Sequence, residues 1–163
     1  MPLPIAHGLV GASAVALIYP NANLKHWKPL LLGFILANCP DLDFVFSFMF
    51  GWHDFHRGFT HSLLFAFLVS SVTFILLRHQ NWRIPLAYSA AFLSHTILDY
   101  SGAKSGAVRL LIPFDNNPYG LGLISFSELS RGFVIQDMLY FSLVEVAIFA
   151  PIFLAIIFIT RKI

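Results

Sequence analysis

His56-Arg57-Gly58-Phe59-Thr60-His61-Ser62 is a polar segment in an otherwise apolar chain. It places two imidazoles, a guanidinium and two hydroxyl groups just before the apolar stretch 63–77. Ionisable side chains at membrane depth are costly, so they need partners or a function. We call this segment the polar heptad. The function that the sequence supports therefore depends on which other residues can contact the heptad.

The composition indicates a membrane protein. Of 163 residues, 58% are hydrophobic, 18 are phenylalanine and 11% are charged, which is more apolar surface than a soluble domain of this size needs. The net charge is only +2, and no basic run with interleaved aromatics occurs, so nucleic-acid binding is not expected. The single cysteine, Cys39, excludes an intramolecular disulfide framework and a thiolate zinc cluster.

Five apolar stretches predict an all-α, polytopic membrane protein, with residues 1–163 forming a single domain. A helix needs roughly 20 apolar residues to cross the hydrocarbon layer. The predicted helices run over 5–19, 27–39, 59–77, 84–103 and 136–160. Pro40 ends the short second helix, because the residue before a proline disfavours helical backbone. Residues 44–52 are too few to span and predict a half-helix or re-entrant piece, and 104–135 predict an interfacial lid or loop.

The loops at the two ends of the predicted helices differ in charge. One end carries only basic residues: Lys25, Lys28, Arg78, Arg83, Arg161 and Lys162. The heptad end mixes Arg57, Lys104, Arg109 and Arg131 with Asp54, Asp115, Glu128 and Asp137. Because cytoplasmic loops are enriched in lysine and arginine, this bias predicts a multi-pass protein whose heptad lies on the external face.

Metal-ligand residues are predicted to converge beside the heptad. If the helices alternate in direction, the start of the first, the end of the second, the start of the third and the end of the fourth share one side of the membrane. These four places hold His7, Asp41, Asp43, His56, His61, His95 and Asp99. Lys25, His26, His79 and Arg83 fall on the opposite side. The sequence therefore predicts a metal site on the heptad side.

The spacing of these residues suits metal binding. His95 and Asp99 are four apart, so they share a helix face and can close on one ion or bridge two. Asp41 and Asp43 point the same way if the backbone between them is extended. Imidazoles with carboxylates and no thiolate favour zinc, manganese or iron(II) in an open site over a closed structural zinc site. Ligands from four segments predict two divalent ions, with zinc first, at the ~3.5–4 Å separation used for phosphoester hydrolysis.

The remaining polar residues have two interpretations each. Arg57 either binds a phosphate oxygen pair or extends to the lipid headgroups. Thr60 and Ser62 either cap the third helix or contact the substrate. Asp43 is either a ligand or an orienting partner of an imidazole. Glu145, in the fifth helix, has a functional or helix-pairing role, because a buried carboxylate there is costly.

Several motifs together resemble a known family. These are Pro40-Asp41-Leu42-Asp43, the heptad followed by Leu63, Leu93-Ser94-His95-Thr96-Ile97-Leu98-Asp99 with His7 upstream, and Gly106-Ala107-Val108-Arg109-Leu110-Leu111-Ile112-Pro113. They are similar to the YdjM-like family of inner-membrane proteins described as metal-dependent hydrolases. The resemblance implies a membrane-embedded metallohydrolase in a bacterial or archaeal cytoplasmic membrane. The order of ligands also resembles, more distantly, the site of zinc-dependent phospholipase C and S1-type nucleases, where the last aspartate bridges two zinc ions.

The leading hypothesis is a membrane-bound hydrolase that cleaves a phosphoester of a phospholipid or lipid-linked substrate through metal-activated water. A carboxylate of Asp41 or Asp43 would accept the proton, and Arg57 would hold the phosphate. The alternative is a non-enzymatic membrane protein with a structural metal site or with loops that bind a protein partner. A metal transporter is disfavoured, because few acidic or histidine residues continue towards the opposite side. The expected partners are membrane lipids, and no pattern indicates an oligomeric state.

Overall fold

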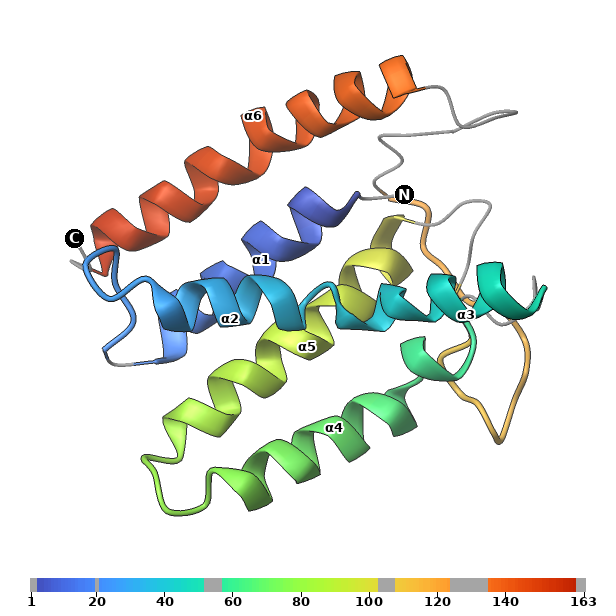
Figure 1. The fold of residues 1–163 in the computed structure, drawn as a ribbon, viewed down its shortest axis with the longest axis horizontal. Coiled ribbons are helices and arrows are strands. Elements are labelled where there is room, and N and C mark those ends of the chain that lie inside the picture. Colours follow the sequence, from blue (N-terminus) through green and yellow to red (C-terminus); the bar gives the residue numbers. More distant parts are fainter. Residues whose placement is uncertain (1–2, 20, 52–56, 103–107, 124–134, 161–163) are drawn as a thin grey trace.

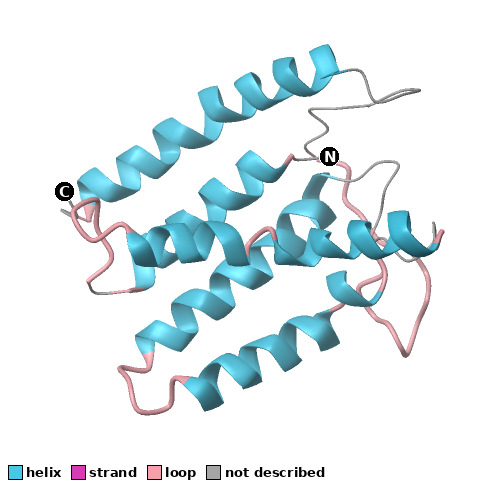
Figure 2. Ribbon diagram, in the orientation of Figure 1, coloured by secondary structure: helices cyan, strands magenta, loops and turns pink. Residues whose placement is uncertain are grey.

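The predicted all-α class is confirmed by the computed structural model, which describes residues 3–19, 21–51, 57–102, 108–123 and 135–160. Within these ranges the chain contains no β-strand, only an isolated bridge between Val108 and Tyr119. The helical elements are α1 (Pro4–Ile18), α2 (Lys28–Leu36), η1 (Cys39–Leu42), α3 (Asp43–Phe50), η2 (Phe59–His61), α4 (Leu63–Leu76), α5 (Arg83–Gly102) and α6 (Ile135–Ile159), where η marks a 3-10 turn (Figures 1 and 2).

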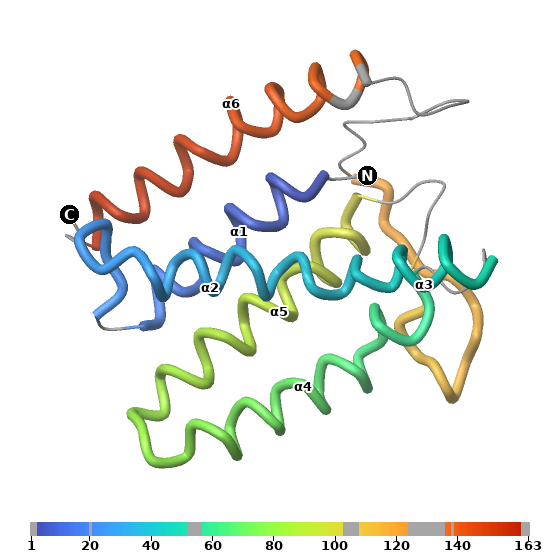
Figure 3. Tube along the Cα trace, in the orientation of Figure 1, coloured from blue at the N-terminus to red at the C-terminus, as the bar shows by residue number. Residues whose placement is uncertain are grey.

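The short, broken second helix is confirmed. Helices α2 and α3 are separated by the 3-10 turn η1, and the chain bends by 52° at this break. Figure 3 follows the Cα trace from α2 into α3. Pro40 lies in η1 and is buried. Because proline lacks an N–H and restricts the residue before it, a continuous α-helix through this point is unfavourable. The half-helix predicted for 44–52 corresponds to α3.

Helix α1 lies at the centre of the fold and packs against α2, α5 and α6. Glycines make the contact with α2 close. A Cβ on Gly11 would lie 2.4 Å from the Cβ of Ala37 and 2.6 Å from the carbonyl oxygen of Gly33. Small residues let two helices approach this closely in a membrane protein. The close contact fixes the depth of α2, and of η1 after it, against α1.

The membrane-spanning prediction is supported for part of the chain. In the described ranges, α6 contains one stretch, Leu139–Ile159, that is long and apolar enough to span, and the bent pair α2–α3 passes the same test if counted as one span. Helices α1 and α4 have 15 and 14 residues, so they measure about 22 and 21 Å against about 30 Å of hydrocarbon. A five-span topology stays a prediction.

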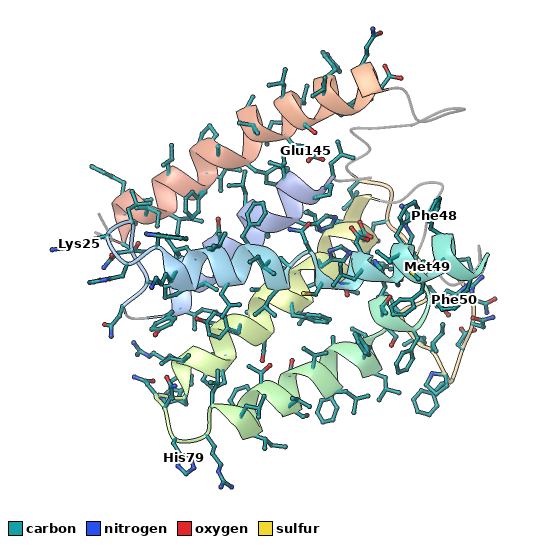
Figure 4. All side chains as sticks on the ribbon, viewed as in Figure 1. Lys25, Phe48, Met49, Phe50, His79 and Glu145 are labelled. Atoms are coloured by element: carbon teal, nitrogen blue, oxygen red, sulfur yellow. The ribbon has the colours of Figure 1, made fainter. Side chains whose placement is uncertain are left out.

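Large apolar side chains cover the outer surface. Helix α3 exposes most of its length, with Phe48 83% and Met49 67% exposed, and Phe50 lies beside them (Figure 4). On a membrane protein such a surface is suited to lipid, because apolar groups there need no hydrogen-bond partner. Helix α3 therefore presents an apolar face directly after the turn that carries Asp41.

The described part of the predicted interfacial loop, residues 108–123, contains no helix and is fastened to neighbouring elements by its backbone. The Leu63 N–H donates to the carbonyl of Leu110 at 2.9 Å, and the Leu121 N–H donates to the carbonyl of Tyr100 at 2.8 Å. At its tip, the Tyr119 hydroxyl donates to Asp115 and thereby holds the pKa of that carboxyl below its usual range. The loop, which follows α5 in the chain, is therefore hydrogen-bonded both to the end of α5 and to the start of α4, next to the polar heptad.

Candidate metal centre

Four of the predicted ligands meet in the structure. Asp41 comes from η1, His61 from η2, and His95 and Asp99 from α5, and one ligand atom of each lies within 4.8 Å of the other three. The residues are buried except for Asp41, whose side chain is 23% exposed. The sequence separates Asp41 from Asp99 by 58 positions, so tertiary packing brings the turns η1 and η2 to the helix face that carries His95 and Asp99. We call these four residues the metal-ligand cluster.

The backbone of α2 fixes the orientation of His95. Its Nδ1 lies 2.7 Å from the carbonyl oxygen of Ala37, and the whole side chain is buried. A carbonyl oxygen only accepts hydrogen bonds, so Nδ1 carries the proton and donates it. The lone pair of the neutral ring is therefore on Nε2, which points into the metal-ligand cluster. Metal-binding histidines commonly have such a partner on the other ring nitrogen.

His61 is oriented in the same way by side chains. Its Nδ1 lies 3.0 Å from Oγ1 of Thr60 and 3.5 Å from Oδ2 of Asp43. The Thr60 hydroxyl donates to Oδ2 of Asp43 at 2.5 Å, so it can accept a hydrogen bond from the imidazole. The Arg57 backbone N–H also donates to Asp43, at 3.3 Å. This arrangement protonates His61 at Nδ1 and leaves its Nε2 lone pair facing the cluster.

Asp41 and Asp43 therefore have different surroundings, and the prediction that both point the same way is wrong. That prediction assumed extended backbone between them. The segment instead forms the 3-10 turn η1 followed by α3, in which residues two positions apart point in different directions. Asp41 faces Nε2 of His61 at 3.4 Å, whereas Asp43 lies on the Nδ1 side of the same ring. The orienting role is thus the one that the contacts of Asp43 favour.

The inner ends of these side chains form a group that could hold a metal ion. The two Nε2 atoms of His61 and His95 are 3.0 Å apart, and both bear lone pairs in the tautomers set by their Nδ1 partners. Oδ1 of Asp41 and both oxygens of Asp99 have no hydrogen-bond partner among the described residues. Buried acceptors without a donor are costly. One proton would serve two of these atoms, whereas a metal ion serves all four.

The spacing of the four atoms fits a small divalent ion. Each Nε2 lies 3.4–3.5 Å from Oδ1 of Asp41 and 3.6–3.7 Å from Oδ2 of Asp99. Ligands at 2.0–2.1 Å in a tetrahedron are about 3.3–3.4 Å from one another, from the bond lengths typical of zinc. Two nitrogens and two carboxylate oxygens also match zinc, manganese or iron(II) by chemistry.

His7 lies at the edge of the metal-ligand cluster. Its Nε2 is 3.3 Å from Oδ1 of Asp99, and its ring stacks on that of His95 with centroids 3.9 Å apart. Neither ring nitrogen of this buried side chain has a hydrogen-bond partner in the described part of the chain. Asp99 thus directs one oxygen to the cluster and the other to His7.

The structure distinguishes among the predicted substrate-binding residues. The Ser62 hydroxyl accepts from the Phe65 N–H at 3.1 Å and donates to the Phe59 carbonyl at 2.7 Å, so it caps α4. Thr60 is engaged with Asp43 and His61. Arg57 has a φ of 62°, a left-handed backbone that is uncommon outside glycine, and its side chain is partly exposed. Substrate contact by these residues stays a prediction.

Other predicted residues lie away from the cluster or outside the described ranges. His56, the first residue of the heptad, lies outside the described ranges, as do Asp54, Lys104, Glu128 and Arg131. Lys25 and His79 lie at the far end of the helices from α3, as the sorting of residues by side predicted (Figure 4). Sequence reasoning missed the Ala37 carbonyl, since a backbone acceptor carries no residue-type signal.

Comparison with known proteins identifies a family that matches the whole chain and a relative that matches most of it. The sequence profile of the YdjM inner membrane protein family matches residues 1–163. The chain is 36% identical over 131 residues to inner membrane protein YbcI of Escherichia coli (strain K12), covering 73% of this chain and 72% of that protein. No solved structure matches. The likeness in ligand order to phospholipase C and S1-type nucleases stays a prediction.

Proposed function

This chain belongs to the YdjM inner membrane protein family, and we propose that it is a membrane-bound, metal-dependent hydrolase acting on a phosphoester of a phospholipid or lipid-linked substrate. The observation that carries the proposal is the convergence of Asp41, His61, His95 and Asp99, whose ligand atoms lie within 4.8 Å of one another. Oδ1 of Asp41 and both oxygens of Asp99 have no hydrogen-bond partner among the described residues. Buried acceptors without a donor are costly, and a cation between them would offset that cost. The chain's membership of a family of inner membrane proteins supports a lipid substrate.

The metal-ligand cluster would hold the first ion, and His7 with the outer oxygen of Asp99 would contribute to a second. A divalent ion of this type supplies Lewis acidity towards a phosphoryl oxygen and makes water a better nucleophile at neutral pH. The protein orients the ligands through the Ala37 carbonyl and the Thr60–Asp43 pair. These contacts fix both imidazoles in the tautomer that exposes Nε2.

Proton acceptance is assigned to Asp41. It is the partly exposed carboxylate of the cluster, at 23%, whereas Asp43 is buried and accepts a hydrogen bond from the Thr60 hydroxyl. A general base must reach the proton of the attacking water. Oδ1 of Asp41 faces the two imidazoles, so Oδ2 is the oxygen suited to accept the proton of the attacking water.

The proposed substrate class follows from what surrounds the site. Asp41 precedes α3, whose apolar face is exposed at Phe48 and Met49, so a lipid tail can lie beside the turn that holds a ligand. Arg57 is two residues before the 3-10 turn of His61, and a guanidinium binds two phosphate oxygens at once. A lipid with a phosphate headgroup matches both features.

The proposal is tested on protein purified in detergent, with bound metal quantified and phospholipids and polyprenyl phosphates assayed for hydrolysis. Wild-type protein is expected to retain zinc, manganese or iron and to turn over one of these lipids. His95→Ala should lose both properties, because it removes a ligand. His79→Ala, at the far end of the helices, is the matched control and should keep both. Metal-free wild-type protein, or a His95→Ala variant unchanged in every assay, would overturn the proposal.

The alternative is a structural metal site in a non-enzymatic membrane protein. The observation in its favour is that His61, His95 and Asp99 are almost fully buried and that four ligands can complete a closed tetrahedral site. In that case chelation would unfold the protein, and no phosphoester would be hydrolysed. Bound metal that exchanges with chelator while the fold persists, together with turnover, would favour the enzyme.

A further inference from the structure

Glu145 is the single acidic residue in the apolar stretch Leu139–Ile159 of α6, and its side chain is 1% exposed. A carboxylate at this depth requires partners, since burying an unpaired charge is expensive. It lies in the half of α6 nearer α3, close to the N-terminal end of α1 (Figure 4). The sequence left its role open between function and helix pairing.

Its partners are backbone amides of α1. The Leu3 N–H donates to Oε1 at 2.5 Å, and the Ala6 N–H donates to Oε2 at 3.2 Å. The first amides of a helix have no partner inside the helix, Pro4 has no N–H, and the Leu3 side chain supplies no cap. Glu145 therefore caps α1 from another helix, with its negative charge at the positive end of the helix dipole.

The capped turn leads directly to the metal centre. His7 follows Ala6, and its backbone N–H bonds to the Leu3 carbonyl at 3.4 Å. Its side chain reaches Asp99 at 3.3 Å. One carboxylate on α6 binds the N–H groups of both Leu3 and Ala6, so it sets the position of α1 along α6. It thereby sets the distance between the His7 side chain and Asp99.

We infer that Glu145 is a positioning residue for the metal centre, which acts through the first turn of α1 to hold His7 against Asp99. This inference rests on the proposed function only in requiring that the centre binds metal. It assigns α6 a specific task beyond anchoring: the membrane-spanning helix supplies the carboxylate that places a ligand on α1.

The test measures the dissociation constant for Zn²⁺, by competition with a chromophoric chelator, in wild type, Glu145→Gln, His7→Ala and the double variant. Glu145→Gln keeps the side-chain volume, but its amide group cannot accept the second N–H. We expect it to weaken binding by about 10–100-fold, the usual effect of losing a residue that orients a ligand. In the His7→Ala background it should cause no further loss, because coupled residues are not additive.

Two further variants separate positioning from loss of stability. Ile157→Ala removes a buried contact at the other end of α6, so it should lower the melting temperature and leave the dissociation constant unchanged. Leu3→Asp combined with Glu145→Ala supplies a cap from α1 itself, which keeps the helix start satisfied without the contact to α6. This double variant should fold and still bind Zn²⁺ more weakly.

The outcomes are distinct. Three results would each overturn the inference. The first is a loss of Zn²⁺ affinity from Glu145→Gln that is equal with and without the His7 side chain. The others are unchanged Zn²⁺ affinity in Glu145→Gln and wild-type Zn²⁺ affinity in the Leu3→Asp/Glu145→Ala variant. Wild-type protein that binds no metal would instead overturn the proposed function. Faster amide hydrogen exchange at Leu3 and Ala6 in Glu145→Gln is expected in either case, since the cap is lost.

Discussion

Replacing Gly11 with alanine is expected to disturb the metal centre from a distance. Gly11 lies on α1, where it faces Ala37 and Gly33, and it has no side chain that could bind a metal ion. An added Cβ would be 2.4 Å from the Cβ of Ala37 and 2.6 Å from the backbone oxygen of Gly33, whereas ordinary contact begins at 3.4 Å. Neither neighbour is a flexible side chain that can rotate away, so the helices themselves must separate.

The size of the effect follows from these distances. Relieving the closer contact requires a shift of 3.4 − 2.4, or about 1 Å, between α1 and α2. The Ala37 carbonyl accepts from Nδ1 of His95 at 2.7 Å, and a change of about 1 Å takes this pair beyond the ~3.2 Å limit of an N–H···O bond. We expect a loss of about 1–3 kcal/mol in the free energy of unfolding from overpacking, and about 10–100-fold weaker Zn²⁺ binding from the misoriented imidazole.

The assay compares Zn²⁺ competition titrations and thermal unfolding of Gly11→Ala and Gly8→Ala in the same detergent. Gly8 is the matched control, because the atoms nearest to a Cβ there belong to the partly buried Phe34 ring, the closest at 2.2 Å, and a ring can rotate. Gly8→Ala should therefore weaken Zn²⁺ binding much less. If Gly11→Ala binds Zn²⁺ as tightly as wild type, the link from helix packing to the orientation of His95 is refuted.

Three other predictions concern the site. Asp43→Asn should weaken Zn²⁺ binding about 10–100-fold, because it disturbs the hydrogen-bond partner of His61. Ser62→Ala should lower the free energy of unfolding by about 0.5–2 kcal/mol, because a helix cap is lost, and should leave Zn²⁺ binding unchanged. Zn²⁺ titration and thermal unfolding measure both, and weaker Zn²⁺ binding in Ser62→Ala with unchanged binding in Asp43→Asn would contradict the assigned roles. Arg57→Ala should raise KM for a phosphate ester without changing the metal content, whereas the control Arg83→Ala should leave KM unchanged. Equal KM values in the two variants would refute a contact between Arg57 and the phosphate. Zn²⁺ at 100 times its dissociation constant should stabilise the fold by about 2.7 kcal/mol, and a melting temperature insensitive to chelator would argue against the centre.

The sequence by itself determined the helices and the side on which the ligands gather. Apolar stretches interrupted by residues such as Pro40 specify where helices can form, because apolar length and proline act locally. The four-residue spacing of His95 and Asp99 places them on one helix face whatever surrounds them. These features depend on short-range geometry, so the predicted helices 5–19 and 84–103 agree closely with α1 and α5.

Only the tertiary structure decided how the ligands are used. The turn η1 directs Asp41 to the cluster and Asp43 to Thr60, a distinction that the two-residue spacing cannot make, because it depends on whether the backbone is extended or helical. The Ala37 carbonyl orients His95 across 58 positions, and Glu145 caps α1 across more than twice that separation. Such contacts arise when helices pack through small residues, and they leave no periodic pattern in the sequence.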